Sequence, residues 1–260
     1  MLTVQQVYDF INERAPFETQ VAYDNSGLLV GDPQQIVTSV LFALDVTHDV
    51  IDAAISGGTN LIVTHHPLMF SPIKRLVETD YETRLLCRLI RENISLIAAH
   101  TNLDQAPGGV NDALAGAIDL TNVSGEGFLR IGDLPSAMTA GELASHISYR
   151  LGDTVVRIMG DPQHVVSRVG LCSGSGSDEW PAAAAQGAQA FLTGEAKHHH
   201  ALAAADAGVV ILEAGHHATE QPGIFALGEA LQSWLDSVQC DVSVFLFGCG
   251  KTPYSTPVRM

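Results

Sequence analysis

The amino-acid sequence predicts an α/β fold in which parallel strands are covered by helices and two similar halves follow one another. Three observations lead to this prediction. Short apolar runs have the length of buried strands, Ala-rich segments between them have helical length, and the pattern recurs in the second part of the chain. We expect the first half to comprise residues 1–120 and the second half residues 121–260.

The clearest repeat joins residues 37–66 to residues 166–195. The two segments align without a gap, and an offset of 129 residues brings Thr64 to Thr193 and Gly58 to Gly187. Each segment contains an apolar run, a small polar turn, a helix-forming stretch, a glycine and a second apolar run. In the first copy we expect buried strands at Val40–Leu44 and Leu61–Val63.

A second match follows the first. ENISLIAAHTNLD leads into His100 and Asp104, and AGVVILEAGHHATE leads into His216 and Glu220, at an offset of 116 residues. The first copy therefore carries 13 more residues than the second, the difference between the offsets of 129 and 116. We place this insertion in residues 67–80, directly after the first histidine pair.

The remaining segments are assigned from the same patterns. The N-terminal segment MLTVQQVYDFINERAP has charged residues among its apolar ones, which is typical of an amphipathic helix and not of a signal peptide. Between the repeats, GELASHISYRLGDTVVRIMGDP predicts a helix, a turn and a strand. The tail VSVFLFGCGKTPYSTPVRM predicts one final strand and then a Gly/Pro-rich end.

The composition of the chain disfavours several classes of protein function. With 46% hydrophobic and 16% charged residues, the chain should be globular, and no stretch approaches the roughly 20 apolar residues that cross a bilayer. Its four cysteines form no CxxC pair, so we expect free thiols and a cytoplasmic protein. A net charge of −16 disfavours nucleic-acid binding but permits an anionic substrate, because bound cations can reverse the local field.

Polar residues of metal-binding type follow four of the predicted strands. In parallel sheets, ligands gather outside the carboxyl ends of the strands. A pairing of the two halves would bring these ends together, which is a hypothesis at this point. The candidate metal ligands are His65, His66, Asp104, His216 and Glu220.

The spacing of these residues suits two ions better than one. His65 and His66 are adjacent, so their side chains leave a strand on opposite sides and can reach two different ions. One carboxylate can bridge two ions about 3.5–4 Å apart. If a helix begins at His216, the spacing of four places Glu220 on the same helical face. Imidazole and carboxylate ligands suit Zn, Fe, Mn, Co or Ni.

Each of these residues has a simpler interpretation when it is taken alone. A single histidine at a strand end is more often a polar residue with ordinary hydrogen bonds than a ligand, and only the four segments together favour a metal centre. The run His198–His200 is internal and so is not a purification tag. His199 shares a helical face with Glu195, and we consider a role for His199 in supporting the ligands.

Two other motifs fail on spacing. Gly250-Lys251-Thr252 looks like the end of a P-loop, but the required first glycine would fall at Phe245. The stretch Gly174–Ser177 lacks the G-x-S-x-G spacing of a nucleophile elbow, so we interpret its glycines as a turn after a strand.

Taken together, the motifs resemble the GTP cyclohydrolase 1 type 2 homolog family, also called Nif-three-like. The similar segments run in order over nearly the whole chain, and the His-His-Pro and Gly-His-x-Ala-Thr-Glu motifs are the most specific. The chain resembles the short form of the family, without the domain that some members insert between the halves. The segments are Asp24-Asn25-Ser26-Gly27-Leu28, Thr64-His65-His66-Pro67, His100-Thr101-Asn102-Leu103-Asp104, Thr193-Gly194-Glu195 and Gly215-His216-His217-Ala218-Thr219-Glu220.

This resemblance implies more than the residues do. It implies a three-layer α/β/α fold of two intertwined halves and a ring-shaped homohexamer, a trimer of dimers. It also implies two metal ions per chain, one held by His66 and Asp104 and the other by His65 and His216, with Glu220 bridging. His100 and Glu195 would contact the ligands without binding metal, although the family commonly has Asp at the position of Glu195.

Three functions are compatible with these expectations. The first is a metal-dependent hydrolase, for which the family name suggests GTP, a nucleotide, as the substrate. The second is a non-enzymatic metal-binding ring scaffold or chaperone. The third, a ring that threads nucleic acid, is disfavoured by the net charge of −16. The sequence leaves open whether the protein is an enzyme.

Overall fold

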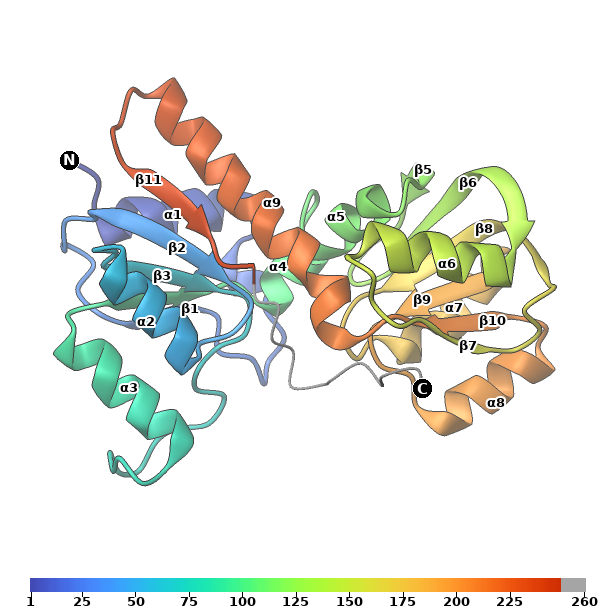
Figure 1. The fold of residues 1–260 in the computed structure, drawn as a ribbon, viewed down its shortest axis with the longest axis horizontal. Helices are drawn as coiled ribbons and strands as arrows, with labels where there is room; N and C mark the ends of the chain where they lie inside the picture. The colour runs from blue at the N-terminus through green and yellow to red at the C-terminus, as the bar shows by residue number, and fades with distance from the viewer. Residues whose placement is uncertain (249–260) are drawn as a thin grey trace. The chain divides into compact units, whose positions relative to one another are not determined.

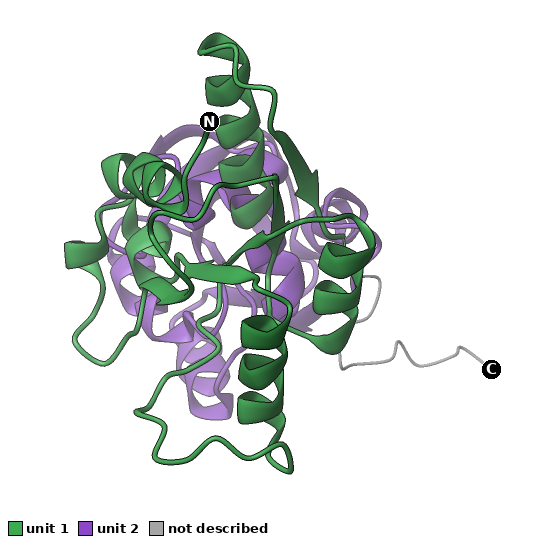
Figure 2. Cartoon of the chain, turned by 90° about the vertical axis from the view of Figure 1, so that its left-hand side faces the viewer, with its two compact units in different colours: residues 1–107, 224–250 green, residues 108–223, 251–260 purple. Residues whose placement is uncertain are grey.

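The computed structural model describes residues 1–248, which fold into two compact units. Of the described residues, unit 1 consists of 1–107 and 224–248, and unit 2 consists of 108–223 (Figure 2). Each unit is built on one sheet with helices on both of its faces (Figure 1). The fold class that the sequence predicted is therefore confirmed, because each unit is a three-layer α/β/α structure.

The sheet of unit 1 has five strands and is mostly parallel. Its order is β1-β4-β3-β2-β11, and only β1 runs antiparallel to its neighbour. The strands are β1 (Gly27–Val30), β2 (Ser39–Ala43), β3 (Leu61–Thr64), β4 (Ser95–Ala98) and β11 (Ser243–Leu246). Strands β2, β3 and β4 are buried along their whole length, as their unbroken apolar runs predicted.

The helices of unit 1 cover both faces of this sheet. On one face, Leu41 and Ala43 of β2 join a core with α2 and α3. On the other face, Phe42 lies against Gly228 of α9, and α9 contacts α1 through Trp234 and Phe10. The helices are α1 (Val4–Arg14), η1 (Phe17–Thr19), α2 (His48–Ser56), α3 (Tyr81–Arg91), α4 (Thr101–Gln105) and α9 (His216–Ser237).

Unit 2 contains a mixed sheet of six strands. Its order is β5-β6-β8-β9-β10-β7, in which β8, β9 and β10 are parallel and the outer strands are antiparallel to their neighbours. The strands are β5 (Thr121–Ser124), β6 (Arg130–Thr139), β7 (Arg157–Met159), β8 (Val165–Cys172), β9 (Ala190–Thr193) and β10 (Val210–Glu213).

Alternate residues of this sheet enter two separate cores. Leu171 and Leu192 face α5 and α6, whereas Cys172 and Phe191 face α7 and α8. The helices are α5 (Val110–Ala117), α6 (Ala140–Arg150), η2 (Ser177–Glu179), α7 (Trp180–Ala185) and α8 (His198–Asp206).

The internal repeat of the sequence corresponds to real structural equivalence. Strands β3 and β9 differ by the expected 129 residues at both ends, and Thr64 and Thr193 pair with equivalent residues of β2 and β8. The third strand of the repeat, β4 in unit 1 and β10 in unit 2, departs from the expected offset by one residue. Thr64 pairs with Ala98 and Thr193 with Glu213, which gives an offset of 115 in place of 116.

The insertion lies in the segment that the sequence comparison indicated. Residues 65–80 connect β3 to α3, whereas only residues 194–197 connect β9 to α8. The longer connection in the first copy therefore begins at the His65-His66 pair.

The boundary between the units differs from the expected division at residues 120 and 121. Unit 1 ends at residue 107, and the chain returns to it at residue 224. The physical reason is that β11 pairs in parallel with β2, and α9 packs on the same sheet. The two halves of the sequence are thus intertwined. The Gly/Pro-rich end, with Cys249 and the Gly250-Lys251-Thr252 motif, lies outside the described residues.

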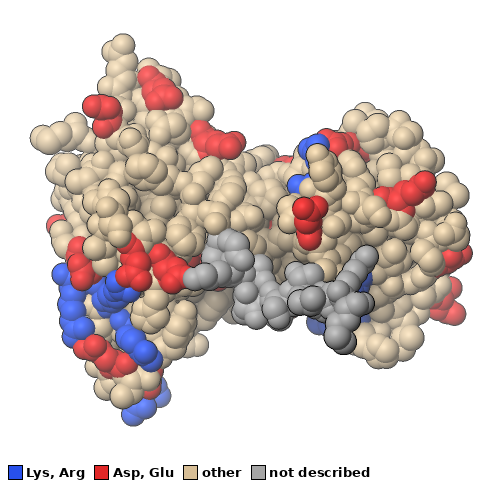
Figure 3. Space-filling model, in the orientation of Figure 1, with Lys and Arg blue, Asp and Glu red and all other residues tan. Residues whose placement is uncertain are grey.

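The ends of the described chain otherwise follow the sequence-based expectations. The N-terminal helix is α1, and Thr3 and Gln6 form a capping box at its start. Within residues 1–248, no helix combines the length and apolarity that crossing a membrane requires. On the face shown in Figure 3, acidic side chains are scattered and basic ones gather mainly over α3, where Arg88 and Arg91 pair with Asp52 and Glu78.

Candidate metal centre

The first histidine pair extends the sheet of unit 1 beyond β3. The backbone N–H groups of His65 and His66 donate to the carbonyls of Ala43 and Leu44, at 3.3 and 2.9 Å. The Thr64 hydroxyl donates to the His66 carbonyl at 2.8 Å. These bonds fix the backbone, so the two side chains start from defined positions. The side chain of His65 is fully buried and that of His66 is 20% exposed.

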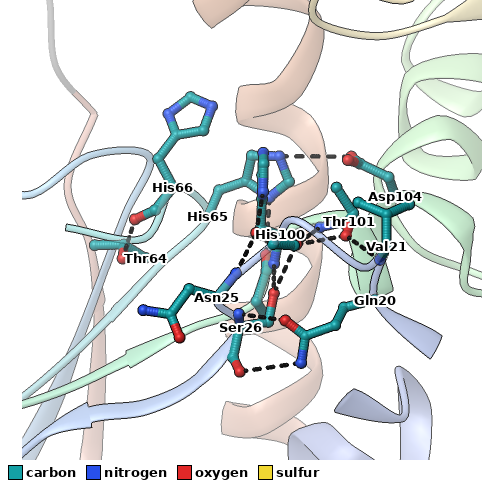
Figure 4. Close-up of polar contacts among 12 residues, drawn as sticks. Gln20, Val21, Asn25, Ser26, Thr64, His65, His66, His100, Thr101 and Asp104 are labelled. Carbon is teal, nitrogen blue, oxygen red and sulfur yellow. Dashed lines mark hydrogen bonds and ion pairs between the residues drawn. The ribbon is translucent and has the colours of Figure 1, made fainter. Parts of the chain in front are cut away.

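The neighbouring strand β4 leads to His100 and Asp104. The Ala99 N–H donates to the Thr64 carbonyl, which carries the sheet pairing one residue past the strand. His100 then precedes α4, and its carbonyl accepts the backbone N–H of Asp104 at 3.0 Å. Asp104 thus lies one helical turn after His100, and its Oδ1 is 3.5 Å from Nε2 of His65 (Figure 4).

Each of the three clustered imidazoles of His65, His66 and His100 has its Nδ1 against an oxygen. Nδ1 of His65 is 2.9 Å from the Ala99 carbonyl, which can only accept, so this nitrogen carries the hydrogen. Nδ1 of His66 is 2.7 Å from a carboxylate oxygen of Asp45. In the neutral form of either ring the lone pair is then on Nε2, the nitrogen that can bind a metal.

His100 is held in the same way by Asp24. Its Nδ1 lies 2.9 Å from Asp24 Oδ1, and the Asp24 side chain is fully buried. Burial by itself raises the pKa of this carboxyl. Hydrogen bonds from His100 and Thr101 and the backbone N–H of Asn25 outweigh burial and hold the pKa of Asp24 well below its usual range. Asp24 is therefore a buried carboxylate that fixes one ring of the cluster.

The three rings of unit 1 form a compact group. The centroids of His65 and His66 are 5.0 Å apart, and His100 lies 5.0 Å from His65 and 5.4 Å from His66. Each residue offers a ring nitrogen, and these three nitrogens lie within 4.8 Å of one another. Metal–imidazole bonds measure about 2.0–2.1 Å, so nitrogens at this spacing suit a shared ion after small side-chain adjustments.

Unit 2 presents a second group at the start of α9. A helix does begin at His216, which meets the condition under which the spacing of four places both side chains on one face, and Nε2 of His216 lies 3.1 Å from Oε1 of Glu220. Nδ1 of His216 is 3.1 Å from Oε1 of Glu195, whose other oxygen accepts the Ser175 hydroxyl at 2.7 Å. Glu220 is almost completely buried, whereas Glu195 is half-exposed.

The turn after β8 shapes the space around this group. Gly174 has a φ of +56°, and a Cβ at this position would collide with Oε1 of Glu220 and lie 3.3 Å from Nε2 of His216. The Gly174 N–H also donates to the Thr219 hydroxyl at 3.1 Å. Glycine is therefore required both by the backbone conformation and by the close approach of a carboxylate. The sequence-based interpretation of these glycines as a turn is confirmed.

The donor set in both units fits a divalent transition metal. It consists of imidazole nitrogens with fixed Nδ1 hydrogens and of carboxylates that are largely buried. Such ligands match Zn, Fe, Mn, Co and Ni, and oxygen partners of Nδ1 usually accompany histidine ligands.

Comparison with known proteins places this arrangement in a family. The model of the Duf34/NIF3 (NGG1p interacting factor 3) family matches residues 2–253. The chain belongs to the Duf34/NIF3 family.

Full-length relatives support this assignment. The chain is 32% identical to the GTP cyclohydrolase 1 type 2 homolog of Clostridium perfringens, over 97% of this chain and 99% of that protein. It is 36% identical to the Streptomyces coelicolor protein of the same name, over 85% of this chain and 83% of that protein. The crystal structure of Staphylococcus aureus protein SA1388 superposes with a TM-score of 0.94 at 28% identity, covering 98% of this chain and 99% of that one.

The remaining candidates of this Duf34/NIF3 protein lie in the α8 region. His199 is exposed, and its ring packs edge-on against His200 at 4.3 Å. His200 lies 3.0 Å from the Ser177 hydroxyl and 3.3 Å from Asp178. The described contacts of His199 thus link it to the surface of α8, and its supporting role at a metal remains a prediction.

Two residues that hold histidine rings in this Duf34/NIF3 protein received no role from the sequence. Asp24 belongs to a motif that was recognised, but its contact with His100 joins positions 76 residues apart, which spacing cannot reveal. Asp45 follows the run Val40–Leu44 directly. The rule that found the other candidates, a polar residue after a buried strand, could have found Asp45 as well.

Proposed function

We propose that this protein binds two divalent metal ions and uses them for hydrolysis. The ligands would be His65, His66, Asp104, His216 and Glu220. The observation that carries the proposal is the hydrogen-bond pattern of the histidines. In both units Nδ1 of each candidate histidine lies against an oxygen, so that Nε2 can bind a metal.

The division of ligands follows the family resemblance. His66 and Asp104 would hold one ion, His65 and His216 the other, and Glu220 would bridge them. The donor chemistry admits Zn, Fe, Mn, Co or Ni. When bound, such ions act as Lewis acids and lower the pKa of water from 15.7 to about 7. The residues of the chain would hold the ions in place, and the buried Glu220 would keep its charge close to both.

The proposed substrate is GTP or a related nucleotide. This part of the proposal rests on the names of the relatives, which are called GTP cyclohydrolase 1 type 2 homologs. The corresponding reaction would consume two water molecules at C8 of the guanine ring, one to break each of its two bonds to ring nitrogen, and would release that carbon as formate. A chain with a net charge of −16 repels a triphosphate, and two bound cations would offset this repulsion locally.

The test combines metal analysis with turnover. Untagged protein would be analysed for metal per chain and assayed for formate release from GTP. We expect about two metals per chain, turnover that stops when the metals are removed, and recovery when they are restored. Glu220→Gln should lose turnover and metal, whereas His198→Gln, a change of an exposed histidine on α8, should retain both.

The outcomes separate the competing functions. Two metals without turnover on nucleotides, phosphoesters or peptides would contradict the hydrolase and favour a metal-binding ring scaffold or chaperone. Protein that binds no Zn, Mn, Fe, Co or Ni after reconstitution would contradict the metal centre itself.

We further propose a ring-shaped homohexamer and a cytoplasmic location. The family resemblance supports the hexamer, and the lack of a CxxC pair in the sequence supports a reducing compartment. Native mass spectrometry should give six copies per particle, and a stable monomer or dimer would contradict this.

A further inference from the structure

A buried carboxylate supports one histidine that the expected ligand set leaves out. Asp24 accepts hydrogen bonds from the hydroxyls of Ser26 and Thr101, from the backbone N–H groups of Asn25 and Thr101, and from Nδ1 of His100. Ser26 also accepts the backbone N–H of His100 at 3.1 Å. Both the ring and the backbone of His100 are therefore tied to residues 24–26 (Figure 4).

This network determines which ring nitrogen of His100 can bind a metal ion. The Asp24 side chain is completely buried and accepts several hydrogen bonds, so it is present as a carboxylate. A carboxylate can only accept, so Nδ1 of His100 carries a hydrogen, and in the neutral ring the lone pair is on Nε2. Because Nδ1 and Nε2 lie on different sides of an imidazole ring, Nε2 points away from Asp24. The His100 side chain is 15% exposed, so it is also accessible.

His100 lies where a metal ligand is expected. Its ring nitrogen and those of His65 and His66 are within 4.8 Å of one another, and all three belong to unit 1. His65 and His66 are themselves held through Nδ1 by Ala99 and Asp45, so the three rings share one arrangement. The contact that fixes the rings of two expected ligands is thus also present at His100.

We propose that His100 binds metal as a third imidazole of unit 1 and that Asp24 is the residue that positions it. This inference rests on the proposed metal centre and adds a ligand to it. Carboxylate partners of histidine ligands usually change metal affinity roughly 10–100-fold when they are removed. The same effect is expected here for Asp24, which does not touch the metal.

The experiment measures Zn²⁺ affinity by competition with a chelator, and the visible spectrum of the Co²⁺-loaded protein. Four proteins are compared, namely wild type, His100→Gln, Asp24→Asn and Asp119→Asn. The last is a matched control, because Asp119 is a carboxylate 3.2 Å from Nε2 of His146, outside the histidine cluster. Thermal unfolding shows which variants fold.

We expect His100→Gln and Asp24→Asn to bind Zn²⁺ roughly 10–100-fold more weakly than wild type and to alter the Co²⁺ spectrum. Asp119→Asn should retain both properties. A loss of fold alone would not change the Co²⁺ ligand field of the protein that remains folded. If Asp24→Asn fails to fold, His100→Gln decides by itself.

The experiment distinguishes a failure of the proposed role of His100 from a failure of the proposed metal centre. If wild type binds Zn²⁺ and His100→Gln binds within twofold of it with an unchanged Co²⁺ spectrum, this inference is overturned and the metal centre stands. If wild type binds neither ion, the metal centre fails, and the role of His100 fails with it.

Discussion

Gly174 and Glu220 approach each other so closely that no side chain fits between them. A Cβ on Gly174 would overlap Oε1 of Glu220, and the φ of Gly174 is +56°. The two residues come from the turn after β8 and from the first turns of α9. The position of a proposed bridging carboxylate therefore depends on a glycine 46 residues earlier, from 174 to 220.

We predict that Gly174→Ala weakens metal binding at Glu220 and His216 by tenfold or more, since the new methyl group must displace the carboxylate. It should also destabilise the protein by roughly 1–2 kcal/mol because a residue with a Cβ is strained at positive φ. The measurements are Zn²⁺ affinity and urea unfolding.

Gly208→Ala is the matched control for this change. Gly208 has a φ of +76°, and a Cβ there would meet nothing within 4 Å. The Gly208→Ala variant should lose stability in urea through backbone strain but should keep its Zn²⁺ affinity. Equal metal affinity in the two variants would show that Gly174 does not shape the site.

A second prediction concerns the carboxylate that holds His216. Glu195 lies 3.1 Å from Nδ1 of His216, so Glu195→Ala should let the ring rotate and should weaken Zn²⁺ binding roughly 10–100-fold. Chelator competition measures the effect. Glu126→Ala removes an exposed glutamate from the same unit and should leave the affinity unchanged. If both variants bind like wild type, Glu195 has no supporting role.

A third prediction tests the ion pair between Arg130 and Asp112. The Arg130 side chain is only 5% exposed, and its Nε lies 2.6 Å from Asp112 Oδ1. Asp112→Ala would leave a buried cation without its carboxylate, and the free energy of unfolding should fall by about 2–4 kcal/mol, less than for a fully buried pair because Asp112 is partly exposed.

Urea unfolding measures this loss. Asp178→Ala is the control, because Asp178 and Lys197 form an ion pair with both side chains more than half exposed. Its effect should stay within about 1 kcal/mol. A similar loss in both variants would argue against any special contribution from the burial of Arg130.

A fourth prediction concerns the start of α6. Thr139 and Glu142 form a capping box, in which each side chain binds the backbone N–H of the other residue. Thr139→Ala should lower the free energy of unfolding by about 1 kcal/mol. Ser145→Ala, on the exposed face of the same helix, should have a much smaller effect.

The stabilisation that this capping box provides should also depend on pH. The backbone N–H and the hydroxyl of Thr139 hold the pKa of Glu142 below its usual value. The contribution of Glu142 is therefore present above its unfolded pKa of about 4.3 and is lost as the pH falls through the lower, folded value. The penalty for Thr139→Ala should accordingly shrink in acid. A penalty that grows as the pH falls would contradict this sign.

The sequence by itself determined the local elements and their repetition. Strands β3 and β9 lie where the 129-residue offset placed them, and the helix considered at His216 begins there as α9. These features depend on contiguous runs of apolar and helix-forming residues, so a short window of sequence contains the information.

The tertiary structure decided which distant residues meet. It paired Asp24 with His100, placed Gly174 against Glu220, shifted the third repeated strand by one residue, and returned β11 to the sheet of unit 1. None of these contacts has a periodic signature. Each arises when packed sheets bring separate segments together, and the free energy of the whole core selects it.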